Sequence, residues 1–69
     1  MEQFNRFLVQ FISKDSDGIE SVEVEEFEVE NPMPGEEIAR WAFAHTNDPT
    51  VYMTRVYVED GRKVGECHI

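Results

Sequence analysis

The chain has one cysteine and no long apolar run. Cys67 has no second cysteine to pair with, so an intramolecular disulfide is excluded, whereas secreted proteins of this size usually depend on such bonds. No apolar stretch approaches the ~20 residues that span a bilayer, and the first residues lack the basic and apolar segments of a secretion signal. We therefore expect a cytoplasmic protein that is neither exported nor membrane-bound.

Basic residues are scarce beside acidic ones. Six Lys and Arg oppose fifteen Asp and Glu, which gives a formal net charge of -9 on 69 residues. Because affinity for phosphates comes from Lys and Arg, direct binding to nucleic acid is not expected. Hydrophobic residues make up 41% of the chain, too many for a disordered acidic tail. The length predicts a single domain over residues 1–69, too small for a large enclosed active site.

The first predicted strand covers residues 4–13 and is apolar on both faces. Its alternation places Phe7, Val9 and Phe11 on one face and Leu8 and Ile12 on the other. A strand with two apolar faces is typical of the middle of a sheet. The pattern therefore predicts a central strand.

A hairpin is predicted to follow. Residues 14–18 supply a turn that ends in Gly18, and a second strand runs over residues 19–30. The apolar residues of this second strand change phase at Glu25 and Glu26. We predict a β-bulge there, which would return the apolar side chains to the inner face.

A helix is predicted between Pro34 and Asn47. Glu36 and Glu37 would lie in its first turn, where the helix dipole favours negative charge. Trp41 belongs to the apolar stripe of this helix and is expected in the core. Asn47 is a candidate for a left-handed cap that ends the helix.

Two more strands complete the pattern, over residues 50–58 and 63–69, with a tight turn at Asp60 and Gly61 between them. The predicted fold is α+β: a four-stranded antiparallel sheet of ββαββ topology, strand order 2-1-3-4, with a right-handed helical crossover and one helix on one face. The other face stays open and is expected to bind a partner or a second copy of the chain.

Glutamates crowd the second predicted strand. Its six carboxylates come from Glu20, Glu23, Glu25, Glu26, Glu28 and Glu30. An extended strand spreads them at ~3.3 Å per residue, close to the ~3.4 Å between phosphates along one DNA strand. The run is interpreted either as a decoy that occupies a basic channel built for nucleic acid, or as a solvated edge strand whose charge prevents aggregation.

Nothing in the pattern predicts catalysis or metal binding. The glutamates alternate along an exposed strand without a pocket to shift their pKa values. The segment from Asp15 to Gly18 lacks the ligand spacing of a calcium loop. Cys67 and His68 are neighbours on a strand and point to opposite faces, and His45 has no nucleophilic partner. We expect no enzyme activity, no metal and no cofactor.

Arg55 and Tyr57 are the other candidate binding residues. Arg55 interrupts an apolar row on the third predicted strand, and Tyr57 follows it on the same face. Arg and Tyr are the residue types that most often anchor protein interfaces. The side chain of Arg55 either extends to the edge of the sheet or projects from the open face, and both residues are candidates for partner binding.

Short motifs in the strands resemble those of one family of phage proteins. The second predicted strand contains Phe27-Glu28-Val29, the third contains Thr54-Arg55-Val56, and an acidic helix start lies between them. Over about residues 6–58 the chain resembles the RNA polymerase inhibitors of short-tailed phages that infect enteric bacteria. Members of that family bind the polymerase jaw and keep promoter DNA out of its channel. The resemblance implies that Arg55 anchors the partner, whereas Tyr57 stands where the family has a second arginine.

Several anti-CRISPR proteins are also similar in size and element order. The sequence thus predicts a non-enzymatic phage inhibitor that binds a basic channel of a bacterial complex, RNA polymerase first and a Cas surveillance complex second. Its binding residues would be the six glutamates with Arg55 and Tyr57. A different hypothesis is a homo-oligomeric accessory protein, such as a homodimer, that pairs through the open sheet face and uses the glutamates only for solubility.

Overall fold

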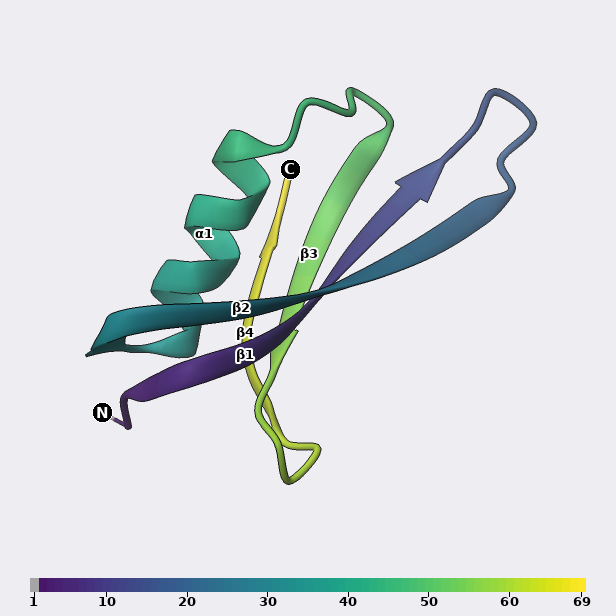
Figure 1. The fold of residues 1–69 in the computed structure, drawn as a ribbon. Helices are drawn as coiled ribbons and strands as arrows, with labels where there is room; N and C mark the ends of the chain where they lie inside the picture. Colours follow the sequence, from purple (N-terminus) through teal and green to yellow (C-terminus); the bar gives the residue numbers. More distant parts are fainter. Residues whose placement is uncertain (1) are drawn as a thin grey trace.

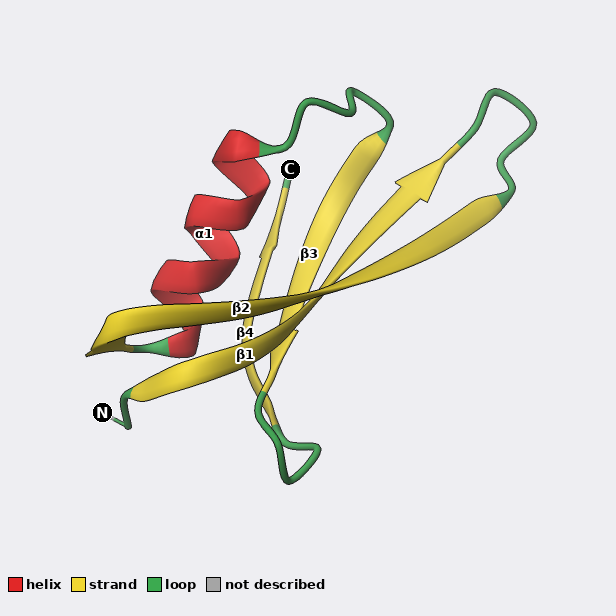
Figure 2. Ribbon diagram, viewed as in Figure 1, coloured by secondary structure: helices red, strands yellow, loops and turns green. Residues whose placement is uncertain are grey.

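The structure, a computed structural model, describes residues 2–69 and consists of one sheet with one helix on it (Figures 1 and 2). The elements are β1 (Phe4–Lys14), β2 (Glu20–Met33), α1 (Gly35–His45), β3 (Val51–Tyr57) and β4 (Lys63–His68). The strands lie in the order β2-β1-β3-β4, and each neighbouring pair is antiparallel. The predicted α+β fold and its strand order are confirmed.

The core lies between α1 and one face of the sheet. It is formed by Phe7, Val9, Val56 and Val58 from the sheet side and Ile38, Ala39 and Ala42 from the helix. α1 packs mainly over β3 and β4. Thr54 is the buried polar residue of this layer, and its hydroxyl donates a hydrogen bond of 2.8 Å to the carbonyl oxygen of Ala39. Sheet and helix are therefore joined by one hydrogen bond as well as by apolar packing.

The central position of β1 is confirmed, and the register shows which of its faces is open. Val9 and Val56 pair in the core, so Leu8 lies on the face without a helix. Leu8 is 41% exposed. Ile12 lies on the same face but is buried, between Val22 of β2 and Met53 of β3 in the register.

The bulge expected at Glu25 and Glu26 is wrong. These residues pair with Val9 and Leu8 in unbroken register, and the irregularity of this pair of strands lies between Phe4 and Arg6. The alternation of apolar residues shifts by one position because the two halves of β2 turn their apolar side chains to opposite faces of the sheet. Phe27 and Val29 pack against the core under α1, whereas Val22 and Val24 lie on the open face. β2 also continues past its predicted end to Met33, which an edge strand tolerates because its outer N–H groups need no partner strand.

The left-handed cap expected at Asn47 is also wrong. Among residues 2–69, only glycines have a positive φ. The helix ends because Thr46 adopts an extended conformation, with φ -69° and ψ 140°, while its N–H still donates to the carbonyl of Ala42. The turn that follows is held by Asp48, whose carboxylate accepts hydrogen bonds from the amide and the hydroxyl of Thr50. The side chain of Asp48 thus redirects the chain without a left-handed residue.

Candidate partner-binding surface

The acidic residues are concentrated in one part of the chain. Between Lys14 and Arg40 there is no basic residue, and ten of the fifteen acidic residues lie there. They are Asp15, Asp17, Glu20, Glu23, Glu25, Glu26, Glu28, Glu30, Glu36 and Glu37. They occupy the β1–β2 turn, the edge strand β2 and the first turn of α1. In Figure 1 the β1–β2 turn, which carries Asp15 and Asp17, projects away from the helix.

The six glutamates of β2 do not form a single row. Glu23 and Glu25 pair with Phe11 and Val9 and share the helix-side face with them. Glu26 pairs with Leu8 and lies on the open face. All six are exposed. The alternation of the strand therefore presents carboxylates on both faces of the sheet edge.

Two of these glutamates are compensated within the molecule. Glu28 accepts from Arg6 with an Oε2–Nη2 distance of 3.0 Å. Glu20 lies 3.9 Å from the ammonium of Lys14 and accepts a hydrogen bond from the hydroxyl of Tyr52. This bond is the main cause that raises the pKa of Tyr52, since ionising the phenol would place two negative charges side by side.

Four glutamates of β2 have no ion-pair partner among residues 2–69. They are Glu23, Glu25, Glu26 and Glu30. Their negative charge is thus offset only by solvent and salt. A partner that brings cations to this edge gains attraction without breaking an internal ion pair.

Arg55 and Tyr57 lie on the open face, since they pair with Gln10 and Leu8 of β1. Tyr57, Leu8 and Glu26 are adjacent in register across β3, β1 and β2. Arg55 Nε lies 3.6 Å from Glu66 Oε1 on β4, and the Arg55 side chain is 40% exposed. The closing β3–β4 hairpin therefore does not bury Arg55. The open face combines this arginine, an aromatic ring and a glutamate.

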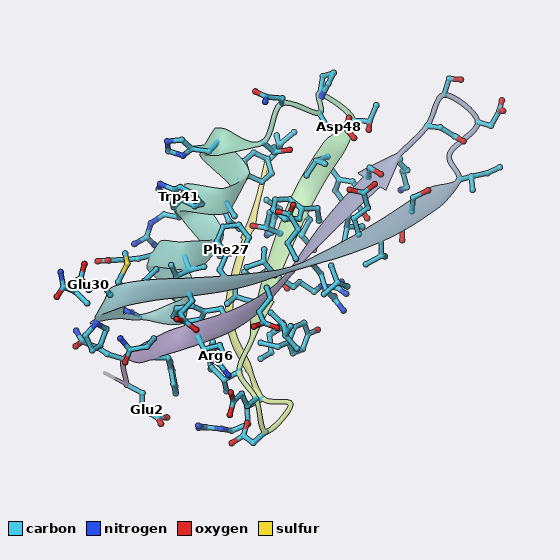
Figure 3. The ribbon with its side chains drawn as sticks, viewed as in Figure 1. Glu2, Arg6, Phe27, Glu30, Trp41 and Asp48 are labelled. Carbon is cyan, nitrogen blue, oxygen red and sulfur yellow. The ribbon has the colours of Figure 1, made fainter. Side chains whose placement is uncertain are left out.

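Trp41 was expected in the core, and this expectation is wrong. Its side chain is 47% exposed and lies on the flank of α1 that faces β2 (Figure 3). The ring meets Phe27 edge-on at 5.5 Å between centroids and stacks on His45 at 4.7 Å. Ala39 and Ala42 are buried against the sheet, and their small side chains let the helix lie close to it, which leaves a ring as large as that of Trp41 at the side.

Two hollows flank Trp41 between α1 and β2. One, of about 400 Å³, is mainly apolar and lined by Phe27, Glu28, Val29, Met33, Ile38 and Trp41. The other, of about 240 Å³, lies toward the end of the helix. Its walls include Phe11, Glu23, Glu25, Trp41, His45 and Asp48. We call the two hollows together the α1–β2 groove. Glu23 and Glu25 thus line a groove beside an exposed aromatic ring.

Within residues 2–69, no three His, Cys, Asp or Glu side chains come together in a way that could hold a metal ion. Over the same residues, no helix has the length and apolar character needed to cross a membrane. Cys67 packs partly against the core, and His68 is exposed on the other side of β4.

A comparison with protein-family models found no match for this chain, and comparisons with curated proteins and with solved structures found none either. The similarity to the phage polymerase inhibitors therefore rests on the short motifs of β2 and β3 and stays a prediction.

Proposed function

We propose that this protein is a non-enzymatic inhibitor that binds a basic, nucleic-acid-handling surface of a bacterial complex in the host cytoplasm. The observation that carries the proposal is the acidic edge of the sheet. Ten acidic residues follow one another without a basic residue, and four glutamates of β2 have no ion-pair partner among residues 2–69. A surface of this kind complements a channel that is lined with Lys and Arg for phosphates.

The mechanism would be stoichiometric occlusion. Complementary charge accelerates encounter between the two surfaces, and this acceleration weakens as salt rises. Once bound, the edge strand places carboxylates on both of its faces where the backbone phosphates would otherwise lie. Arg55 and Tyr57 would add a short-range contact from the open face, where Tyr57 is in register with Leu8 and Glu26 and Arg55 pairs with Gln10.

RNA polymerase is the first target to test, because the motifs at Phe27-Glu28-Val29 and Thr54-Arg55-Val56 resemble those of the phage polymerase inhibitors. A Cas surveillance complex is the second, since it also holds nucleic acid in a positively charged channel. Neither interaction requires a cofactor.

The test measures binding to purified RNA polymerase from an enteric bacterium, and formation of the promoter complex, at low and high salt. The test variant changes Glu23, Glu25 and Glu26 to Gln. The control variant changes Glu2 and Glu59 to Gln and Asp60 to Asn, which removes the same charge outside this acidic stretch. We expect the wild type and the control to bind and to block the promoter complex, and the test variant to bind at least ~10-fold more weakly. Equal binding by both variants, or an affinity independent of salt, would contradict the proposal.

The open face favours a second candidate function, self-association. Leu8, Val22 and Val24 are all large apolar residues exposed on it, the last at 56%. A homodimer through this face would cover them and would leave the glutamates only to keep the protein soluble. Sedimentation velocity distinguishes the two proposals: a stable dimer that a charge at Leu8 dissociates supports self-association, whereas a monomer at every concentration supports the inhibitor.

A further inference from the structure

We infer that the α1–β2 groove receives an arginine side chain from a partner segment, with the guanidinium between Trp41 and the carboxylates of Glu23 and Glu25. The inference rests on the proposed function, because it states how a basic partner would be recognised. It assigns a short-range role to two glutamates that the occlusion mechanism uses only as charge.

The apolar half of the groove is already in place without a partner. Phe27, Val29 and Met33 are partly buried and pack against the core on one side, while their other side lines the hollow of about 400 Å³. Trp41 closes it from the helix. Because the fold already holds these residues in place, little binding free energy is lost to rearranging the groove when a partner side chain enters it.

The acidic half offers an aromatic wall and two free carboxylates. Glu23 and Glu25 line the hollow of about 240 Å³ and have no ion-pair partner among residues 2–69. Trp41 is held in place by His45, which lines the same hollow, stacks on one face of the indole, and has its Nδ1 2.9 Å from the Trp41 carbonyl oxygen. Asp48 also lines the hollow, but its carboxylate is bonded to Thr50. The unsatisfied charge in the groove is thus that of the two glutamates.

Arginine fits this arrangement better than any other side chain. Its guanidinium is planar, stacks on aromatic faces, and forms paired hydrogen bonds with carboxylates. Lysine supplies the same charge, but its ammonium is compact and strongly hydrated and does not stack. The three methylenes of arginine add apolar contact along the rings of Trp41 and Phe27, and a preceding apolar residue of the partner would fill the neighbouring hollow.

The test uses Trp41 as its own reporter, since it is the only tryptophan of the chain. Acetyl-Leu-Arg-amide is titrated into the full protein while indole fluorescence and backbone amide shifts are followed. The matched ligands are acetyl-Leu-citrulline-amide, a neutral isostere, and acetyl-Leu-Lys-amide. We expect saturable millimolar binding of the arginine ligand, ~5- to 10-fold tighter than the citrulline ligand and tighter than the lysine ligand, with shifts clustered at residues 23–29 and 41–48.

Two variants remove the same charge at different places. Glu23→Gln with Glu25→Gln should lower the affinity for the arginine ligand to that of the citrulline ligand. Glu30→Gln with Glu37→Gln should leave the affinity for the arginine ligand within ~2-fold of the wild-type value. These two residues do not line the groove, and surface charges act weakly at a distance. Equal affinities for arginine and citrulline, equal losses in the two variants, or no saturable change up to ~50 mM ligand would overturn the inference.

Failure of this inference and failure of the proposed function give different results. A Trp41→Phe variant that folds and binds RNA polymerase as the wild type does shows that position 41 tolerates substitution. If a Trp41→Leu variant then also binds RNA polymerase as tightly as the wild type, the groove inference is wrong and the inhibitor proposal stands. If the arginine ligand binds as described and no polymerase binds, then the groove recognises arginine and the proposed target is wrong.

Discussion

Gly65 of β4 and Gly35, the first residue of α1, meet backbone to backbone. A Cβ atom on Gly65 would lie 2.5 Å from the carbonyl carbon of Gly35 and 2.8 Å from the amide nitrogen of Glu36. Both glycines are buried. With no side chain between them, the start of the helix is held tightly over β4, at the edge of the sheet opposite to β2. This close approach leaves the other flank of α1 uncovered, and it is this flank that carries Trp41.

Replacing Gly65 with alanine is expected to destabilise the fold strongly. The new methyl group would overlap backbone atoms, which cannot rotate away as the end of a side chain can, so α1 or β4 has to move. Overpacking of this kind costs ~1–3 kcal/mol of the free energy of unfolding. Urea unfolding measures it, with Lys63→Ala in the same strand as a control that should change stability by less than ~0.5 kcal/mol. Unfolding of the Gly65→Ala variant at the wild-type urea concentration would show that the contact is looser than described.

Thr54 should contribute to stability through its hydroxyl. The side chain is buried in β3 and donates a hydrogen bond of 2.8 Å to the carbonyl oxygen of Ala39. Valine has nearly the same shape without the donor, so Thr54→Val removes this bond while it keeps the packing. We expect a loss of ~1 kcal/mol in the free energy of unfolding, measured by urea titration. A variant as stable as the wild type would mean that this hydrogen bond makes no net contribution to the free energy of unfolding.

The fold was predictable because local patterns agree with the tertiary arrangement. The two-sided apolar pattern of β1 marks a strand with neighbours on both sides, and the turn at residues 14–18 leaves only a hairpin to its partner. The two prolines near residue 33 separate this hairpin from the helix. Each of these signals depends on a few adjacent residues and on steric rules of the backbone.

The errors arose where a side chain's surroundings come from distant parts of the chain. The phase change in β2 alone predicts a bulge, because nothing in the strand itself shows that its two halves bury opposite faces. The helical stripe predicts Trp41 in the core, because the stripe does not show that the helix lies toward β4. The groove beside Trp41 also exists because α1 lies toward β4 and away from β2. The acidic residues of the candidate site could be named from the sequence, whereas their division between two faces could not.

Arg55 is expected to matter for binding and hardly for folding. Its side chain is exposed and its nearest carboxylate, that of Glu66, lies at 3.6 Å, so Arg55→Ala should shift the melting temperature by no more than ~3 °C. If Arg55 anchors the partner, the same change should weaken binding to RNA polymerase by ~10-fold or more. Arg40→Ala removes an equal charge from the helix surface and serves as the control for binding. Equal affinities of the two variants would exclude Arg55 as an anchor.

The turn after α1 should make stability depend on pH below about 4. The hydroxyl of Thr50 donates to the Asp48 carboxylate at 2.6 Å and is the main cause that holds the pKa of Asp48 below its ordinary value, with the Thr50 amide as the second cause. Because this pKa is lower in the folded than in the unfolded chain, the ionised carboxylate stabilises the fold above pH ~4, and that contribution is lost as the pH falls through the folded value.

Thr50→Ala tests this dependence, because it removes the hydroxyl donor and keeps the amide. The pKa of Asp48, followed by carbon NMR of its carboxyl group, should rise toward the ordinary value of ~3.9. Asp60, whose pKa is lowered by its bonds with Arg62, provides an internal control and should not move. The variant should be less stable than the wild type at pH 7, and the difference should narrow in acid, where Asp48 is protonated in both proteins. A difference that stays constant from pH 7 to pH 2 would show that the Thr50 hydroxyl acts through packing and not through the charge of Asp48.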